Sequence, residues 1–264
     1  MARTDKRVAF VTGASQGVGQ AIGERLAADG WHVAVCARRQ DALDRVVAGI
    51  EAAGGSAEAV VLDMRDADAI AGVIADLARR HGRLDGLVNN AGRFSGRHIA
   101  DTTLDEFRLN FVMNTEAPFL TMKAAIPVMI TQGGGSIVNI ASMSGMRAST
   151  GTGGYGASKA ALIHLGAIVA MEVGEHNIRV NTVTPGSTWS PTFAKSLEGK
   201  SEEEVAAMQK SATILGRFAQ PSEIGDAVGF LLSDDARFIT GVNLPVEGGA
   251  YWFRGGNRLI GKRH

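Results

Sequence analysis

A tyrosine and a lysine placed four residues apart, Tyr155 and Lys159, are the side chains of this sequence best suited to acid–base chemistry. Four residues make about one turn of an α-helix, so in a helix the phenol and the ammonium project from the same face. A free phenol titrates near pH ~10, and a cation held beside it favours the phenolate and lowers its pKa toward the neutral range. Ser142, thirteen residues upstream, adds a hydroxyl for the same site. The constellation predicts a general acid with a tuning charge, although such a pair also arises by chance on solvated helix faces.

These residues need a scaffold, and the pattern of apolar runs predicts one. Short β-branched runs alternate with longer helical patterns, which is typical of βαβ units and a parallel sheet. The expected strands cover residues 8–11, 33–37, 59–62, 84–88, 137–141, 179–183 and 242–246, and the expected helices cover 18–29, 41–53, 66–81, 104–131, 155–175 and 221–232. No repeat or composition break divides the chain, and only 186–213 forms a long irregular stretch. We expect one α/β domain over residues 1–264, with a Rossmann-type doubly wound parallel sheet of about seven strands and helices on both faces.

Composition limits the function classes. The 264 residues carry 27 Lys+Arg and 27 Asp+Glu, so no general electrostatic field favours nucleic acid or an anionic membrane. Cys36 is the only cysteine, which excludes an intrachain disulfide and a cysteine-rich metal site. No group of His, Asp and Glu has metal-ligand spacing along the sequence, so no metal is expected. The apolar stretch 8–11 is too short for a signal peptide or a membrane span, and a cytoplasmic location is expected.

A glycine-rich turn follows the first expected strand and opens the first expected helix. Its residues include Gly13, Ser15, Gln16, Gly17, Val18 and Gly19, in the spacing Gly-x-x-x-Gly-x-Gly. Glycines let the backbone approach a pyrophosphate closely, and a helix N-terminus offers unpaired N–H groups to it. A glycine cluster alone is weak evidence in a chain with 34 glycines, but its place between strand and helix predicts a dinucleotide site.

The end of the second expected strand indicates which dinucleotide binds. An NAD site places an acidic residue there for the ribose hydroxyls, whereas this strand ends in Arg38 and Arg39. Guanidinium groups bind a 2′-phosphate well, through two parallel N–H donors. The alternative is a pair of surface arginines at a strand exit. NADP(H) is the predicted cofactor, with Arg38 ahead of Arg39, and NAD(H) is the less favoured choice.

Five ordered motifs resemble those of the short-chain dehydrogenase/reductase family, from about Lys6 to Gly249. They are Asn89-Asn90-Ala91-Gly92, Asn114, Asn139-Ile140-Ala141-Ser142, Tyr155 with Lys159, and Pro185-Gly186. The resemblance implies that Ser142 steadies the substrate oxygen and that Tyr155 exchanges a proton with it. It implies that Lys159 lowers the phenol pKa and holds the nicotinamide ribose, and that Asn114 relays protons through a water. It also implies further cofactor contacts from Asp63, Met64, Asn90, Ala91, Gly92, Tyr155, Lys159, Pro185, Gly186, Thr188 and Ser190.

By the same resemblance, the reaction interconverts a ketone and a secondary alcohol on a small-to-medium, largely apolar substrate. Enoyl reductases of this superfamily separate the tyrosine and lysine by more residues, and dehalogenating relatives carry arginine in place of Lys159, so both are disfavoured. Three alternatives stay open: an NAD-dependent alcohol dehydrogenase of the same family, a non-catalytic dinucleotide-binding regulator, and a scaffold that recruits a partner through its tail.

Substrate contacts and assembly are expected outside the central motifs. A substrate lid is expected at about 187–213. Apolar side chains of this lid and of two neighbouring loops would line the pocket or pack the lid: Phe94, Met143, Met146, Trp189, Phe193, Leu197 and Met208. Family members usually form tetramers, so a homotetramer, or a homodimer, is expected. The C-terminal extension, about 250–264, begins with the aromatic triplet Tyr251-Trp252-Phe253, which we expect to pack at a subunit interface.

Overall fold

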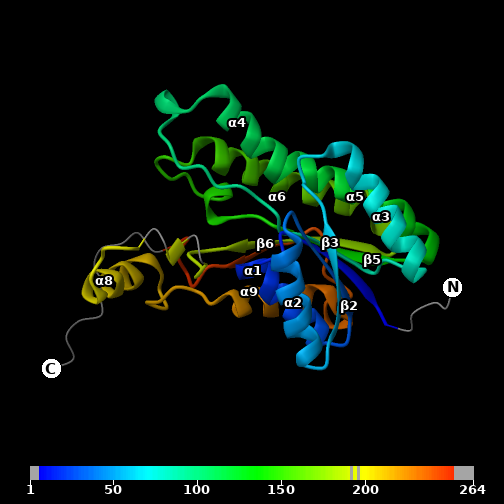
Figure 1. The fold of residues 1–264 in the computed structure, drawn as a ribbon. Coiled ribbons are helices and arrows are strands. Elements are labelled where there is room, and N and C mark those ends of the chain that lie inside the picture. The colour runs from blue at the N-terminus through cyan, green and yellow to red at the C-terminus, as the bar shows by residue number, and fades with distance from the viewer. Residues whose placement is uncertain (1–5, 191–192, 195–196, 253–264) are drawn as a thin grey trace.

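A seven-stranded sheet forms the centre of the computed structural model, which describes residues 6–190, 193–194 and 197–252 (Figure 1). The strands are β1 (Val8–Thr12), β2 (His32–Ala37), β3 (Ser56–Val61), β4 (Gly86–Asn89), β5 (Gly135–Ile140), β6 (Ile178–Pro185) and β7 (Asn243–Val246). Their order is β3-β2-β1-β4-β5-β6-β7, and every neighbouring pair is parallel. The chain changes direction across the sheet between β1 and β4, and folds of this kind bind ligands outside the carboxyl ends of the strands at that point. The predicted doubly wound sheet is confirmed.

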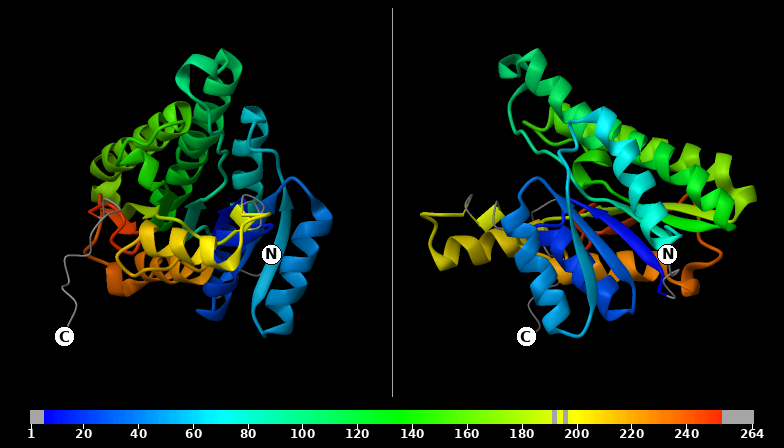
Figure 2. Two further views of the ribbon diagram at one scale, coloured as in Figure 1. Left: turned by 90° about the vertical axis from the view of Figure 1, so that its left-hand side faces the viewer. Right: turned by 45° about the vertical axis from the view of Figure 1, so that its right-hand side comes forward.

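Helices cover both faces of the sheet (Figure 1, Figure 2). One face carries α3 (Ala67–His81), α4 (Leu104–Phe111), α5 (Ala117–Gln132) and α6 (Gly153–Val173), and the other carries α1 (Gly17–Ala28), α2 (Gln40–Ala52) and α9 (Pro221–Leu232). Alternate residues of β1 serve the two layers. Phe10 packs in the core with residues of α3 and α5, whereas Val11 packs in the core with residues of α1 and α9. Both side chains are fully buried, which explains why parallel strands of this kind form nearly continuous apolar runs.

Three segments differ from the expectation. β3 begins at Ser56 rather than at 59, because the polar residues Ser56 and Glu58 pair with β2 although their types do not indicate a strand. The helix expected over 104–131 is divided by a π-helical segment, η2 (Val112–Glu116), between α4 and α5. The stretch 186–213, expected to be irregular apart from a helix start at the acidic run 202–204, contains the whole helix α8 (Glu202–Ala212), which starts at a capping box formed by Ser201 and Glu204. α8 stands out beyond the carboxyl ends of the strands (Figure 2).

The helix that continues from Gly153 to His176 is long and apolar enough to cross a membrane by length and composition. In this fold its first part, α6, packs against β6 and against η3 (Met143–Gly145). Leu162, Val169 and the charged Lys159 are all buried within the domain. The apolar character of α6 is therefore that of a core helix.

Candidate active site

The glycine-rich turn is held against the end of β4 by close backbone packing. Gly13 has a φ of +67°, and a Cβ atom there would lie 2.8 Å from the Cα of Ala91. A Cβ atom on Gly19 would lie 2.3 Å from the backbone oxygen of Gly13. The Asn90 Nδ2 donates to the backbone oxygens of Thr12 (2.9 Å) and Gly13 (3.1 Å). The turn therefore needs glycine at these two positions, and the Asn90 side chain braces it from the neighbouring strand.

A cleft of about 540 Å³ opens along this turn. Most of the predicted cofactor residues line it: Gly13, Ser15, Gln16, Gly17, Val18, Gly19, Arg38, Arg39, Asp63, Met64, Asn90, Ala91, Gly92 and Ser190. Five predicted contacts lie outside its lining. Pro185, Gly186 and Thr188 are at the carboxyl end of β6 and just after it, where Thr188 pairs with Ala219, and Tyr155 and Lys159 are on α6. The lining also includes six residues that the sequence motifs do not indicate: Ala37, Leu62, Arg65, Arg93, Leu109 and Met113.

Arg65 is the most informative of these additions. Its guanidinium forms an ion pair with Asp63, with Nε 3.0 Å from Oδ1. Hydrogen bonds from Arg65, helped by the charge of Arg38, hold the pKa of the Asp63 carboxyl below its ordinary value. The sequence could have indicated Arg65, because it lies two residues after Asp63 and just beyond the end of a strand. Arg38 was selected as a cofactor contact for the same reason, its position at the end of a strand.

Ser142 and Tyr155 come together because η3 packs directly on α6. Ser142 is the N-cap residue of η3, where its Oγ accepts from the backbone N–H of Ser144 (3.2 Å). A Cβ atom on Gly156 would lie 2.7 Å from the backbone oxygen of Ser144, so only glycine lets the two segments approach this closely. The Ser142 hydroxyl lies near enough to the Tyr155 phenol to favour its ionised form and so to lower its pKa. The hydroxyl groups of Ser142 and Tyr155, both predicted as catalytic, therefore lie side by side.

Lys159 lies one turn further along α6 and is almost fully buried, with 4% of its surface exposed. Its Nζ donates to the backbone oxygen of Ile140 (2.7 Å), and burial lowers the pKa of the ammonium from 10.5 to about 8. Burial also raises the pKa of the Tyr155 phenol above its ordinary value, and the Ser142 hydroxyl only partly opposes this. The expected lowering of the phenol pKa is therefore not seen in this structure, because loss of hydration outweighs the favourable contacts.

Asn114 is fully buried in the π-helical segment η2. Its Oδ1 accepts from the Arg93 backbone N–H (2.9 Å), and its Nδ2 donates to the Arg93 backbone oxygen (2.9 Å) and to Ser158 Oγ (3.0 Å). A Cβ atom on Gly92 would lie 2.7 Å from Asn114 Oδ1 and 3.3 Å from Lys159 Nζ, so both polar groups adjoin Gly92. The structure thus brings Asn114 to the lysine, and Ser158 joins the group although the motifs do not indicate it.

Aromatic side chains lie beside Tyr155 and in the lid region. The Phe94 ring meets the Tyr155 ring edge to face, with centroids 5.0 Å apart. In the lid region Trp189, Phe193 and Phe218 form a mutual cluster, with centroids 4.9–5.9 Å apart. Phe218 lies outside the predicted lid. Trp189 and Phe193 were expected either to line the substrate pocket or to pack the lid onto the domain. Their contacts with Phe218 show the second of these.

The start of the C-terminal extension is tied to the domain. Arg147 Nη1 donates to the backbone oxygen of Ala250 (2.8 Å), and the Tyr251 backbone N–H donates to Glu247 Oε2 (2.7 Å). Trp252 is 80% exposed and meets the Tyr251 ring edge to face. Phe253 and the basic residues after it lie outside the described part of the chain, so the predicted interface role of the triplet stays a prediction.

Known proteins are similar to this chain over nearly its whole length. A family model described as enoyl-(acyl carrier protein) reductase matches residues 13–251. Dehydrogenase/reductase SDR family member 4 of Oryctolagus cuniculus is 38% identical over 247 residues, which cover 92% of this chain and 93% of that protein. The solved structure of actinorhodin polyketide ketoreductase with NADPH superposes with a TM-score of 0.89 at 32% identity, over 95% of this chain and 99% of that one. The structure of NAD+-bound xylitol dehydrogenase superposes with a TM-score of 0.86 at 33% identity. The superposition covers 92% of this chain and 98% of that one. This chain therefore belongs to the short-chain dehydrogenase/reductase family, whose members are oxidoreductases that act on CH–OH groups with a nicotinamide dinucleotide.

Proposed function

We propose that this protein is an NADP(H)-dependent oxidoreductase that interconverts a ketone and a secondary alcohol on a small-to-medium, largely apolar substrate. The observation that carries the proposal is that Lys159 Nζ lies beside Gly92, a residue of the cleft wall, while Tyr155, one turn earlier on the same helix, adjoins Ser142. The cleft fits a dinucleotide, because its volume lies in the range of ligand sites and Gly13 and Gly19 leave room for close approach to a pyrophosphate. When bound, the nicotinamide supplies or accepts a hydride.

The side chains of the chain itself handle the proton. Because the Ser142 hydroxyl lies beside the Tyr155 phenol, both hydroxyls can donate to the same substrate oxygen. Tyr155 gives its proton to that oxygen in reduction and takes one from the alcohol in oxidation. Lys159, with a pKa of about 8, is mostly cationic at neutral pH and stabilises the phenolate that reduction leaves. Asn114 holds the backbone of Arg93 beside this group and is the proposed end of the proton relay.

Three guanidinium groups in the cleft support NADP(H) over NAD(H). Arg38 and Arg39 follow β2, and Arg65 follows β3. Two carboxylates lie near them: Asp63 is paired with Arg65, and Asp41 is paired with Arg39. An arrangement with excess positive charge suits a 2′-phosphate better than a bare ribose diol.

We also propose that the enzyme works as a homotetramer, or as a homodimer, in the cytoplasm, on small molecules and without nucleic acid or membrane. Apolar side chains on the outer faces of α5 and α6 support assembly: Phe119 is 43% exposed, Ile168 40% and Met171 87%. The equal numbers of acidic and basic residues give no field that would attract a polyanion.

The Tyr155→Phe variant tests the proposal, and Tyr251→Phe is its matched control because these are the only two tyrosines of the chain. On a panel of cyclic and aromatic ketones followed by NADPH absorbance, Tyr155→Phe should lose about 10²- to 10⁴-fold in kcat with NADPH binding retained. Tyr251→Phe should keep its activity. Unchanged activity in Tyr155→Phe would favour the regulator or scaffold alternative. With an enone substrate the expected product is the allylic alcohol, and a saturated ketone would instead show C=C reduction.

A further inference from the structure

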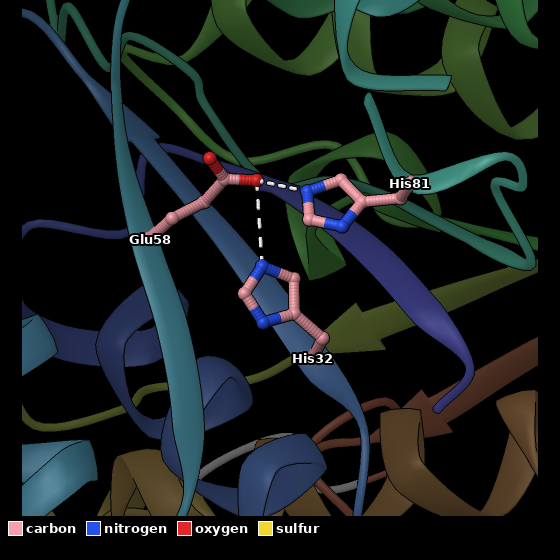
Figure 3. A group of neighbouring side chains, drawn as sticks. All are labelled: His32, Glu58 and His81. Atoms are coloured by element: carbon pink, nitrogen blue, oxygen red, sulfur yellow. Dashed lines mark hydrogen bonds and ion pairs between the residues drawn. The ribbon is translucent and has the colours of Figure 1, made fainter. Parts of the chain in front are cut away.

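Three side chains able to ligate a metal meet at the amino ends of the strands, away from the cleft at their carboxyl ends: His32, Glu58 and His81 (Figure 3). The sequence predicts no metal site, because Glu58 lies 26 residues from one histidine and 23 from the other, which is no short ligand motif. The fold nevertheless brings these three residues together. His32 begins β2, Glu58 lies on the neighbouring strand β3, and His81 is the last residue of α3.

The strand register brings two of these side chains to one face. His32 lies opposite Ser56, and Ala34 lies opposite Glu58, so His32 and Glu58 project on the same side as Ala34. Ala34 packs in the core with residues of α3, which shows that this is the side covered by α3. All three candidate ligands are held on regular elements and are largely buried, with side-chain exposures of 15% for His32, 23% for Glu58 and 17% for His81.

The ligand atoms converge on a single point. Glu58 Oε1 lies 2.6 Å from His81 Nε2 and 3.4 Å from His32 Nε2, and all three atoms lie within 4.8 Å of one another. Tetrahedral zinc, with bonds of about 2.0–2.2 Å, separates its ligand atoms by roughly 3.3 Å. To hold a Zn²⁺ ion, Glu58 Oε1 and His81 Nε2 must therefore separate by roughly 0.7 Å, and the two histidine nitrogens must come to a similar spacing.

The surrounding groups leave the right atoms available. His32 Nδ1 lies 2.8 Å from Ser56 Oγ, and Arg80 holds the other Glu58 oxygen, Oε2. The tautomer in which His32 donates its Nδ1 proton to Ser56 leaves the Nε2 lone pair free to bind a cation beside Glu58 Oε1. The negative end of the α3 dipole, at His81, also favours a cation here.

We propose that His32 Nε2, Glu58 Oε1 and His81 Nε2 bind one Zn²⁺ ion, which ties the edge strand β3 to β2 and to α3. Two imidazole nitrogens and one carboxylate oxygen suit zinc, whereas magnesium and calcium prefer oxygen ligands only. Three protein ligands leave a fourth position for water. The site lies at the opposite end of the strands from Tyr155, so its role is structural and does not depend on the proposed reaction.

The test uses the full chain, stripped with a chelator and titrated with ZnCl₂ by calorimetry and with CoCl₂ by visible absorption. We expect one Zn²⁺ per chain, the absorption of tetrahedral Co²⁺, and a higher melting temperature in the presence of zinc. His81→Ala should weaken Zn²⁺ binding at least tenfold and remove the gain in melting temperature. Ser56→Ala should weaken binding about tenfold, because it removes the partner that orients His32.

The matched control is His176→Ala, since His176 forms a comparable pair with Glu175 (3.8 Å) but has no third ligand among the described residues. This variant should bind Zn²⁺ like the unmodified chain. Should His81→Ala fail to fold, histidine ring signals of the unmodified chain decide, because zinc must shift those of His32 and His81 first. The proposal is overturned by the absence of saturable binding, by binding that His81→Ala leaves unchanged, or by shifts confined to other histidines.

Discussion

The Lys159 ammonium donates a 2.7 Å hydrogen bond to the backbone oxygen of Ile140, the last residue of β5. This bond ties the catalytic helix α6 to the strand whose exit carries Ser142. The lysine thus positions two proposed catalytic elements relative to each other, besides bringing a charge to the site. This position buries the ammonium group, and the loss of hydration lowers its pKa.

The pH dependence of stability should report this buried lysine. The folded-state pKa of Lys159, about 8, lies below its ordinary value of 10.5, so between these values the unfolded chain binds more protons and stability rises with pH. Relative to Lys159→Met, the free energy of unfolding should increase by about 3 kcal/mol from pH ~8 to ~10.5. Urea unfolding across this window measures it. Cys36, whose pKa burial raises to about 12, acts equally in both proteins and cancels in the difference.

Substitution in the glycine turn should separate cofactor binding from folding. Gly19→Ala would place a Cβ atom 2.3 Å from the Gly13 oxygen, so we expect NADPH binding to weaken at least tenfold in a fluorescence titration. Gly49→Ala is the matched control, because Gly49 lies in α2 with no atom within 4 Å of the added methyl group. That control should bind NADPH normally and be more stable by about 0.5–1 kcal/mol. Equal NADPH affinity in the two variants would contradict the assigned role of the turn.

Cofactor choice should depend on the strand-exit arginines. Arg38→Ser should raise the KM for NADPH about 10- to 100-fold and leave the KM for NADH unchanged, because a charged hydrogen bond is worth about 1.5–3 kcal/mol. Arg65→Ser should act in the same direction. Arg79→Ser serves as the control, since Arg79 lies on α3 in an exposed ion pair with Asp76 and does not line the cleft. An unmodified enzyme that prefers NADH, or uses both cofactors equally well, would refute the role given to Arg38.

Removal of the C-terminal extension should change assembly. Trp252 is 80% exposed, and an indole in water is expected to be covered by a second subunit. A chain ending at Gly249 should shift toward smaller species in size-exclusion chromatography with light scattering. A chain ending at Phe253 keeps the aromatic triplet and should assemble normally. Unaltered assembly and kinetics in the shorter chain would contradict the interface role.

Much of this enzyme could be predicted from local patterns. The helix at Pro221–Leu232 agrees residue for residue with its prediction, since Pro at its first position and its apolar face lie within one segment. The four-residue spacing of Tyr155 and Lys159 is likewise a local pattern, because any α-helix over these residues places both side chains on one face. By contrast, the sequence pattern did not predict that β3 starts at Ser56, because Ser56 and Glu58 are polar. These residues belong to the strand because β2 pairs with them.

The sequence alone therefore determined the family motifs and the order of elements, since each depends on patterns within short segments, and it predicted the residues proposed to handle the proton. Only the tertiary structure decided that burial raises the Tyr155 pKa, that Arg65 joins the cleft and that His32, Glu58 and His81 meet. The physical reason is the same in each case. Hydration, charge and ligand geometry depend on neighbours in space, and the parallel sheet brings those neighbours from distant parts of the chain.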